Sequence, residues 1–569
     1  MGGAVAVAGT SLLGVVPVVV EPGRVRVGPR EEPGEPGCSE CLSSRRYRAA
    51  TRLGGPRQVA APSPLLTPAA RDVVTALVDV APHDAVLLVD LTDLSVTRHR
   101  FLPDPFCPRC GGLPPDRPEH LSLTARPKTA PDRHRVWDAE RELPRLVDTF
   151  VDDHCGLVNS LNPAALGSLA VAGAPIRLRG KTAFEPGFGR SRSYRRSQAI
   201  ALLEALERYG AIGPGGRIST VEACYAQVRE RAIDPRRLGL HPPEHYDLPG
   251  FPYRRFTPDE VCRWVWGYSF GQRRPVLVPE RNVHYGQSDD RPFCYELANG
   301  CALGSCLEEA IFHGVLEVLE RDAFLLTWYT RARAPRIDLA TAADPEVRLV
   351  AAAITTETGY RVECYDITPD HGVPCVWALA RNDTDEPATI SAAAAGPSLE
   401  RAAAGALAEL GPMVPTVRGH FPGHADQARR LAADGSQVRS MIDHYLVYGV
   451  REAAGRLAFL TEGAEQIAFP GPVEGFQHDD LSDDLRFLIG RLAQTGLDVI
   501  AVDLTTPEHR AGGLRCVKVL VPGTVSMTFG EQNRRTWGLP RLLDPAVTHG
   551  RGAPVRTHAD LNPDPHPFP

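Results

Sequence analysis

The strongest constraint on the fold is a long helical pattern in residues 296–324, which places its acidic side chains on one side. At about 100° per residue along a helix, three glutamates and a histidine of this stretch fall within one arc of about 80°. Like charges one helical turn apart repel by a few tenths of a kcal/mol, so such a stripe predicts a cation nearby. A Gly-containing turn, from Asn299 to Ser305, leads into the helix. The residues of the stripe are Glu309, His313, Glu317 and Glu320.

A second acid-bearing helix is expected in residues 197–212, with Glu204 and Glu207 one turn apart and Arg208 beside them. The Gly-containing run that precedes it, residues 187–197, is basic. Carboxylates on two helices, next to a cationic loop at a helix N-terminus, predict Mg²⁺ ions held between the protein and nucleotide phosphates. The alternative is a pair of amphipathic helices with Glu/Arg surface pairs. The cations of the basic run are Arg190, Arg192, Arg195 and Arg196.

The motifs GFGRSRS, EALERY and ANGCALGSCLEEAIFHGVLEVLERDA, in this order, resemble the YcaO family. Further matches are GLDVIAVDLTTPE, VKVLVPGTVSMTFGEQNRR and the final NPDPHPFP, so the resemblance spans roughly residues 135–569. It implies a large α+β domain that binds ATP without a P-loop. One departure is Ile200, where family members often carry a small hydroxyl residue. The implied magnesium and ATP ligands are Glu204, Glu207, Glu309, Glu317 and Glu320, with Arg321, Arg190 and Arg401 facing phosphates and Glu409 as a further candidate.

Residues 1–112 form a smaller unit with strand-like runs at 15–20 and 85–91. Two CxxC pairs in this unit can together make a tetrathiolate, which predicts a structural zinc because no coordination position stays open. Unliganded or disulfide-bonded pairs are the alternative. The unit resembles the second half of ThiF-like, cyclodehydratase-associated domains, without their first half and without a winged-helix leader-binding module. The cysteines are Cys38, Cys41, Cys107 and Cys110.

The remaining organisation follows from composition. Residues 113–135 are rich in Pro and Arg and indicate an inter-domain linker, so residues 136–569 form the large domain. GKT at 180–182 is not a P-loop, because Pro175 stands where that motif requires glycine. Residues 412–480 are interpreted as peripheral.

Charge and cysteine usage narrow the class of protein. A net charge of −6 over 569 residues gives no bulk attraction to nucleic acid. Thirteen cysteines, mostly isolated in apolar stretches, indicate reduced thiols in a bacterial cytoplasm. The apolar N-terminal run contains Pro17 and is too short to span a bilayer, so no membrane association is expected.

The C-terminal tail carries alternating prolines, which hold a chain extended. A mobile terminus or an adaptor ligand is the ordinary interpretation of such a tail. In the YcaO family, however, a PxPxP tail is associated with azoline-forming cyclodehydratases, whose C-terminal end reaches into the active site. The resemblance thus implies a catalytic tail, which orders the site or offers its terminal carboxylate as a base. Its prolines are Pro563, Pro565, Pro567 and Pro569.

The resemblance implies ATP-dependent cyclodehydration of Cys, Ser or Thr in a ribosomal precursor peptide, by phosphorylation of a backbone amide oxygen. His313 orients a carboxylate or takes a proton, or is a packed core histidine. Implied partners are the precursor peptide, a separate leader-binding ThiF-like or RRE protein, an azoline dehydrogenase and a second copy of the chain. Rival functions are thioamide or macroamidine formation, a di-iron oxidase, and a non-enzymatic scaffold; the di-iron design requires Glu-x-x-His pairs that His313 does not form.

Overall fold

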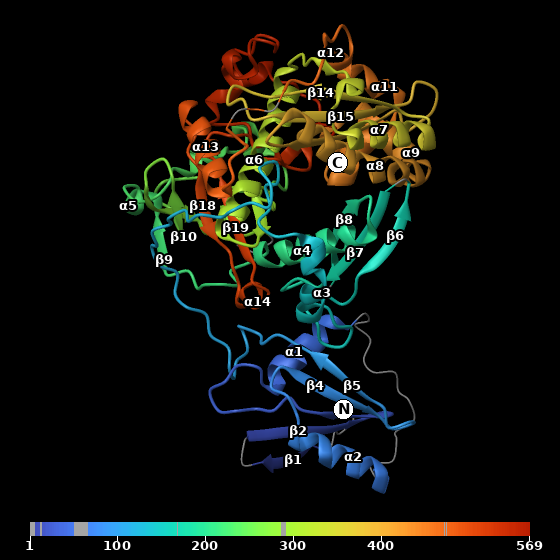
Figure 1. Ribbon diagram of the computed structural model, residues 1–569. Coiled ribbons are helices and arrows are strands. Elements are labelled where there is room, and N and C mark those ends of the chain that lie inside the picture. Colours follow the sequence, from blue (N-terminus) through green and yellow to red (C-terminus); the bar gives the residue numbers. More distant parts are fainter. Residues whose placement is uncertain are drawn as a thin grey trace.

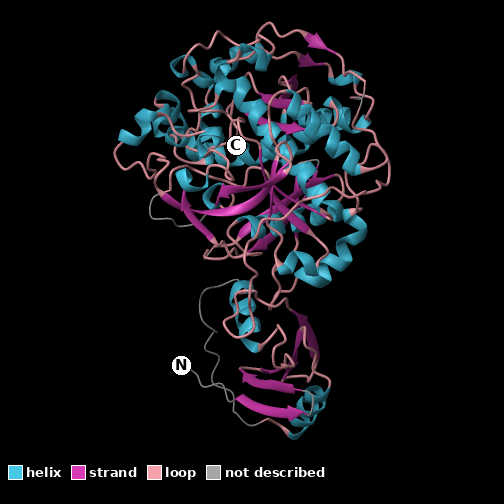
Figure 2. Cartoon of the chain, turned by 90° about the vertical axis from the view of Figure 1, so that its left-hand side faces the viewer, coloured by secondary structure: helices cyan, strands magenta, loops and turns pink. Residues whose placement is uncertain are grey.

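The computed structural model describes residues 6–11, 14–50, 66–167, 169–181, 183–285, 292–471, 473 and 475–568. A small N-terminal domain lies below a much larger body of mixed helices and sheets (Figure 1). Figure 2 shows the narrow connection between the two from the side. The expected α+β architecture is confirmed. None of the helices among the described residues combines the length and apolar character needed to cross a membrane.

The N-terminal domain is built on one antiparallel sheet in the order β1-β2-β3-β4-β5. The strand-like runs predicted at 15–20 and 85–91 are its strands β2 and β4. Alternating valines of β2 and β3 lie on one face of the sheet and pack against α2. Together they form the small core of this domain. The elements are β1 (Ala6–Ser11), β2 (Gly14–Glu21), β3 (Arg24–Val27), α1 (Ser39–Ala49), α2 (Pro68–Asp79), β4 (Ala85–Asp90) and β5 (Val96–Arg100).

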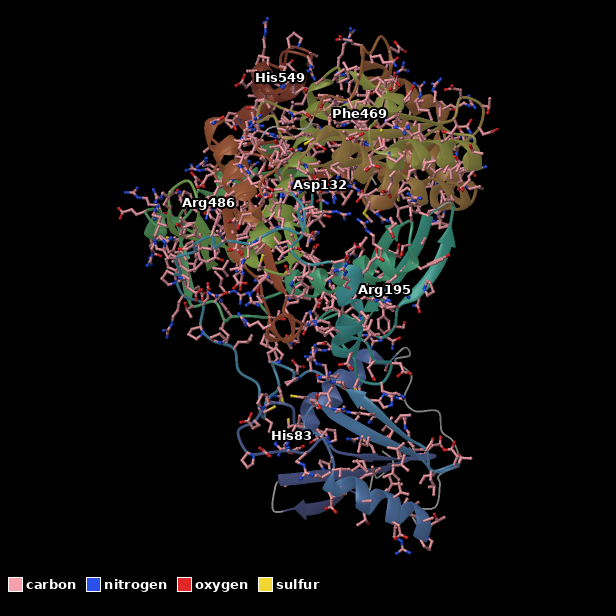
Figure 3. The ribbon with its side chains drawn as sticks, in the orientation of Figure 1. His83, Asp132, Arg195, Phe469, Arg486 and His549 are labelled. Atoms are coloured by element: carbon pink, nitrogen blue, oxygen red, sulfur yellow. The ribbon has the colours of Figure 1, made fainter. Side chains whose placement is uncertain are left out.

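The proline-rich segment 113–135 contains no helix or strand, as predicted for a linker, but it is fixed along the large domain. Lys128 Nζ lies 2.6 Å from Asp484 Oδ2, and both side chains are fully buried. Arg126 Nε lies 2.9 Å from Glu308 Oε2. Asp132, labelled in Figure 3, belongs to this segment. The linker therefore runs as a strap across the large domain.

The first sheet of the large domain has the order β11-β10-β18-β19-β12, with β9 paired to β10. Two of its strands, β18 and β19, lie within the motifs GLDVIAVDLTTPE and VKVLVPGTVSMTFGEQNRR or directly before them. The turn expected between Asn299 and Ser305 contains the short strand β12, which leads directly into α6. The elements are β9 (Val221–Cys224), α5 (Tyr225–Val228), β10 (Val261–Ser269), β11 (Arg274–Pro279), β12 (Cys301–Gly304), α6 (Leu307–Thr330), α13 (Leu481–Gln494), β18 (Ile500–Asp503), α14 (Pro507–Ala511) and β19 (Arg515–Leu520).

A second sheet, in the order β16-β15-β14-β13-β17, is covered by α7 and α8. The prediction that residues 412–480 are peripheral is wrong. Leu446, Val447 and Tyr448 are fully or almost fully buried, because α10 packs under the C-terminal tail. The elements are β13 (Arg336–Ile337), α7 (Pro345–Thr358), β14 (Arg361–Asp366), β15 (Cys375–Arg381), β16 (Thr389–Ala395), α8 (Leu399–His420), α9 (Ala425–Ala433), α10 (Met441–Gly449), α11 (Arg451–Ala454), α12 (Ala458–Thr461) and β17 (Gln466–Ile467).

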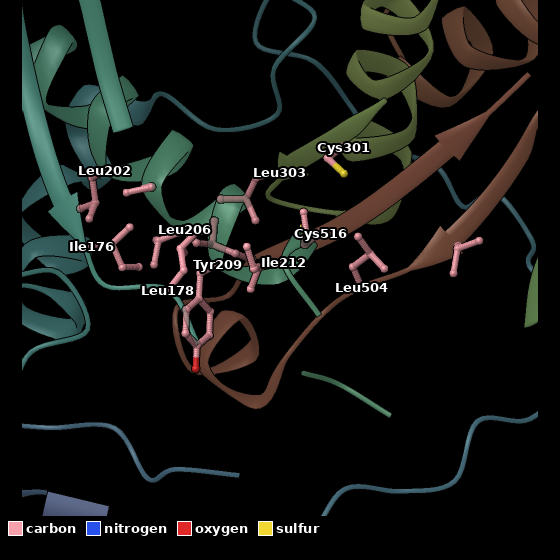
Figure 4. Close-up of a cluster of buried hydrophobic side chains, with 14 of the residues drawn as sticks. Ile176, Leu178, Leu202, Leu206, Tyr209, Ile212, Cys301, Leu303, Leu504 and Cys516 are labelled. Carbon is pink, nitrogen blue, oxygen red and sulfur yellow. The ribbon is translucent and has the colours of Figure 1, made fainter. Parts of the chain in front are cut away.

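A third, three-stranded sheet carries α4 on one face. Buried Leu202 and Leu206 of α4 meet Ile176 and Leu303 in a continuous core (Figure 4). This core joins α4 to β12, the strand that leads into α6, so the two acid-bearing helices rest on one packed unit. The elements are α3 (Ala139–Phe150), β6 (Asn162–Leu166), β7 (Leu169–Ile176), β8 (Glu185–Ser191) and α4 (Tyr194–Ala211).

Candidate active site

The basic loop and α4 pack so closely that glycine is required between them. A Cβ atom on Gly187 would lie 2.3 Å from the Ala201 carbonyl oxygen, and one on Gly189 would lie 1.8 Å from that of Ser197. This close approach lets the Phe188 amide donate a 2.8 Å hydrogen bond to Glu204 Oε2. The first part of the predicted Gly-containing run, residues 187–191, thus belongs to strand β8 and fixes the first glutamate of the site, whereas residues 194–197 form the start of α4.

Carboxylates of α4 and α6 share one partly buried region. Burial and the neighbouring carboxylates of Glu317 and Glu204 raise the pKa of Glu207 well above its usual range. Burial raises the pKa of Glu317 to about 7 and that of Glu320 to about 8, with other glutamates adding to each rise. The two helices therefore bring four of the five predicted glutamates together in one electrostatic group.

Arg321 is the cation at the centre of this group. Burial opposes its charge, but Glu320, Glu317 and Glu409 together raise its pKa above the usual range. Arg321 Nε lies 3.2 Å from Glu320 Oε1. Both atoms are buried, and neither has a hydrogen-bond partner among the described residues. Such buried polar atoms ordinarily find a partner, so this pair is open to a ligand that carries both positive and negative groups.

The other predicted arginines stand at the margin of the group. Arg190 Nη1 lies 3.9 Å from Glu409 Oε1, which brings β8 and α8 to the same acids. Arg401, also on α8, lies 3.7 Å from Asp132 of the linker instead. The weakly indicated Glu409 is therefore part of the electrostatic group, whereas Arg401 contacts the strap.

Glu309 is placed differently from the other four glutamates. Its carboxylate accepts hydrogen bonds from Arg135 Nη1 at 2.9 Å, the Val136 amide at 3.0 Å and the Ser305 hydroxyl at 2.7 Å. It precedes Glu317 by eight residues, about 12 Å along the helix axis. Arg135 also lowers the pKa of Glu207, so Glu309 joins the group only through this arginine, which the sequence analysis missed.

His313 contacts the strap and not a carboxylate. One ring nitrogen, Nε2, lies 2.9 Å from the His134 carbonyl oxygen and can only donate to it. Burial and the charge of Arg135 lower the pKa of His313 well below its usual range. The imidazole is therefore neutral, and of the three roles considered its contacts fit a packed, hydrogen-bonded histidine.

The C-terminal tail enters the same region. The Tyr448 hydroxyl donates to the Pro565 carbonyl at 2.5 Å, and His444 Nδ1 donates to the His566 carbonyl at 2.7 Å. The ring of Phe568 is 3% exposed and lies 4.3 Å from the guanidinium carbon of Arg321. Of the predicted tail prolines, Pro563 is exposed and Pro565 and Pro567 are buried, while Pro569 lies outside the described residues.

A cavity of about 30 Å³, lined by both polar and apolar residues, includes Arg321 in its wall. Glu296, on its wall, pairs with Lys518 at 3.2 Å and with Arg535 at 2.9 Å, and all three are almost fully buried. Lys518 also lowers the pKa of Glu317. The sequence analysis missed these residues, although a lysine inside the apolar strand CVKVLV, in a chain with only three lysines, is a usable signal.

The four predicted zinc ligands lie together in the N-terminal domain. Cys38 Sγ is 3.5 Å from Cys107 Sγ, and Cys110 Sγ is 3.3 Å from Cys41 Sγ and 3.4 Å from Cys38 Sγ. A tetrahedral zinc tetrathiolate with 2.3 Å bonds separates its sulfurs by about 3.8 Å, so small shifts would accommodate the ion. Burial alone raises a thiol pKa, but backbone amides of Cys38 and Gly37 help to lower that of Cys110 to about 7. The donor set and its geometry fit zinc.

Comparisons with known proteins agree on the large domain. A family model described as YcaO cyclodehydratase, ATP- and Mg²⁺-binding, matches residues 188–525. An uncharacterized protein of Methanothermobacter thermautotrophicus is 27% identical over 379 residues, 61% of this chain and 83% of the relative. An uncharacterized protein in the tfuA 3' region of Rhizobium leguminosarum bv. trifolii is 27% identical over 284 residues, 47% of this chain and 63% of the relative.

Two solved structures show the shared fold. A heterocyclase in complex with substrate and cofactor has a TM-score of 0.77 at 22% identity, covering 96% of this chain and 76% of that chain. The YcaO protein from Methanopyrus kandleri, bound with AMPPCP and Mg²⁺, has a TM-score of 0.50 at 21% identity, covering 71% of this chain and 95% of that chain. The first match extends over the N-terminal domain as well as the large one.

Proposed function

The chain belongs to the YcaO cyclodehydratase family, and from this premise we propose that it converts Cys, Ser or Thr residues of a ribosomally made precursor peptide into thiazolines or oxazolines, using ATP. The observation that carries the proposal is the group of four glutamates on α4 and α6, with Arg321 among them; the pKa values of Glu207, Glu317 and Glu320 are raised. Clustered carboxylates of this kind are suited to divalent cations.

The reaction divides into two steps. The side-chain thiol or hydroxyl loses its proton and attacks the carbonyl carbon of the preceding residue, which closes the five-membered ring, and the carbonyl oxygen takes the γ-phosphoryl group of ATP, releasing ADP. Phosphate then leaves with that oxygen, the amide nitrogen loses its proton, and a C=N bond forms within the ring to give the azoline. The peptide loses one water per ring, and ATP becomes ADP and phosphate. Because phosphoryl transfer depends mainly on positioning and charge neutralisation, the protein needs carboxylates and arginines more than a nucleophile.

The residues divide this work between them. Glu204, Glu207, Glu317 and Glu320 are the groups that hold magnesium in this proposal, and Glu309 would join them only by exchanging Arg135 for the ion. Magnesium, when bound, offsets the charge of these acids and of the phosphates. The phosphate oxygens face Arg321 and Arg190, with Arg401 further out on α8.

The tail orders the peptide side of the site in this proposal. Phe568 covers one face of Arg321, and the backbone around His566 is fixed by Tyr448 and His444. In this proposal, the buried residues Pro565 to Phe568 bound the space in which an amide oxygen would meet the γ-phosphate. A precursor peptide bound there would reorder the contact between Phe568 and Arg321.

We also propose a structural zinc at the four cysteines, supported by their mutual distances. The proposed partners are the precursor peptide, a separate leader-binding ThiF-like or RRE protein, an azoline dehydrogenase and a second copy of the chain. The heterocyclase with the similar fold is described with a bound substrate and cofactor, which supports a substrate and a cofactor here.

The test is reconstitution of the full chain with its leader-binding partner, a precursor peptide, ATP and Mg²⁺, followed by mass spectrometry and phosphate release. We expect one water lost per ring and peptide-dependent formation of ADP and phosphate. A peptide product in which sulfur has replaced an amide oxygen would indicate thioamide formation instead. A product in which an amine has closed a ring would indicate macroamidine formation. Absence of peptide-dependent phosphate release would favour a binding scaffold.

A further inference from the structure

A second group of metal-ligand side chains lies where the N-terminal domain meets the large domain. His99 belongs to β5, and Asp152, Asp153 and His154 form the turn that follows α3. His99 Nδ1 is 2.9 Å from Asp152 Oδ2 and 4.0 Å from Asp153 Oδ1, while His154 Nε2 is 3.7 Å from Asp153 Oδ1. We propose that these four side chains bind a divalent transition-metal ion of the zinc class, separately from the tetrathiolate.

The distances match such an ion. Bonds of 2.0–2.2 Å from zinc to imidazole nitrogen and carboxylate oxygen separate neighbouring ligand atoms by about 3.3 Å in a tetrahedral site. The observed separations lie on both sides of this value. The centres of the two imidazole rings are 4.2 Å apart and the ring planes lie at 74° to each other, so both rings approach the Asp153 carboxylate without stacking over each other. Small side-chain rotations would complete the geometry.

Charge and burial favour the same conclusion. The two carboxylates of the group carry a net charge of −2, which a divalent ion balances. The side chain of His99 is 11% exposed and that of Asp153 is 74% exposed, which gives an ion a route from solvent. Imidazole ligands select zinc, copper or nickel over magnesium.

A bound ion would join two domains. In the structure, His99 and Asp152 already connect β5 to the turn after α3 by one hydrogen bond. Asp152 Oδ1 is occupied by the amides of His154 and Cys155, and the Cys155 thiol donates to the Arg100 carbonyl. The ion would take the place of the proton between His99 and Asp152 and would add His154 and Asp153 to the link. The site is a metal clamp at the domain boundary.

The test uses the full chain with its tetrathiolate loaded, titrated with ZnCl₂ by calorimetry and, separately, with CoCl₂ by absorption. We expect one further ion per chain, and a Co²⁺ spectrum of this ion without thiolate charge-transfer bands. His154→Ala should weaken binding by more than the roughly 10–100-fold cost of losing an outer-shell partner. Asp153→Ala should weaken binding as well, and because Asp153 is largely exposed this variant does not threaten folding.

The control is His83→Ala. His83, labelled in Figure 3, is an exposed histidine of the same domain, 3.5 Å from Glu32 and outside the group. We expect this variant to bind the further ion as the parent does. The proposal is overturned if the parent binds no zinc beyond the tetrathiolate ion, or if His154→Ala and Asp153→Ala bind the additional ion with unchanged affinity.

Discussion

Arg45 of α1 and Glu508 of α14 lie 463 positions apart and form a fully buried ion pair, with Nη2 and Oε1 separated by 2.7 Å. The Tyr209 hydroxyl donates to the same carboxylate oxygen at 2.7 Å. Tyr209 is two residues beyond Glu207 on α4, and α1 begins between two of the clustered cysteines. The pair thus connects the tetrathiolate unit to a helix of the candidate active site.

Replacing Arg45 by methionine should lower the free energy of unfolding by about 3–5 kcal/mol, because Glu508 would keep a buried charge with no cation. Urea unfolding of the metal-loaded chain measures this loss. The double variant Arg45→Met, Glu508→Gln should recover part of it, since the stranded charge is gone. A loss below about 1 kcal/mol, the value of an exposed pair, would contradict the role assigned to burial.

Glu317→Gln and Glu320→Gln should each remove measurable binding of Mg²⁺ with an ATP analogue while leaving the unfolding midpoint unchanged or higher. The reason is that neutral amides avoid both the cost of burying a charge and the repulsion by neighbouring glutamates, which together raise the pKa of these carboxyls. Calorimetric titration and thermal unfolding measure the two quantities.

Glu309→Gln is the matched comparison on the same helix. This variant should clearly lower the unfolding midpoint and should change the nucleotide affinity little, because Glu309 accepts hydrogen bonds from Arg135 and the Val136 amide. The reverse pattern, with affinity lost and stability kept, would make Glu309 a direct metal ligand.

The stability of the metal-free chain should depend on pH through Glu317 and Glu320, whose folded-state pKa values are about 7 and about 8. In the unfolded chain both carboxyls are ionised above about pH 4.3. The folded state therefore binds more protons, and its stability falls as pH rises through 7 to 8. Mg²⁺ with nucleotide should release protons on binding near pH 7, seen as a buffer-dependent enthalpy.

The control for this linkage is the double variant Glu317→Gln, Glu320→Gln. It should show a flatter dependence of stability on pH between 6 and 9 than the parent, measured at equal ionic strength. Equal slopes for the two proteins would mean that other groups carry the dependence.

The acidic stripe could be predicted from the sequence because helical periodicity is a local property. Helix α6 begins at Leu307, two residues after the turn that was expected to lead into it. The partner of each carboxylate is not local. Glu309 and Glu317 belong to the same predicted stripe, yet in the structure Glu309 is held by Arg135 of the strap. The buried group of Glu296, Lys518 and Arg535 depends on three distant segments, so no single stretch of sequence reveals it.

Cys107→Ser should remove one zinc per chain, as measured by elemental analysis, and should destabilise the N-terminal domain. Four ligands hold a structural zinc with an apparent 10–16 kcal/mol, and α1 depends on Cys38 and Cys41 at its start. Cys364→Ser is the control: its thiol is fully buried in β14, away from the cluster. Zinc content should stay at the parent value in the control, and equal zinc in Cys107→Ser would refute the tetrathiolate.

Phe568→Ala should reduce the rate of peptide cyclisation more than the affinity for Mg²⁺ and ATP. The Phe568 ring covers Arg321 and packs on Phe324 with ring centres 4.9 Å apart. Its loss frees the end of the tail, whereas the carboxylates on α4 and α6 stay in place. Pro563→Ala is the matched control, because this proline is exposed and should tolerate the change. Product formation followed by mass spectrometry, alongside nucleotide titration, separates the two effects. If Phe568→Ala cyclised peptide as fast as Pro563→Ala, the contact with Arg321 would have no part in turnover. If it lost nucleotide binding to the same extent as cyclisation, the tail would belong to the nucleotide site and not to the peptide side.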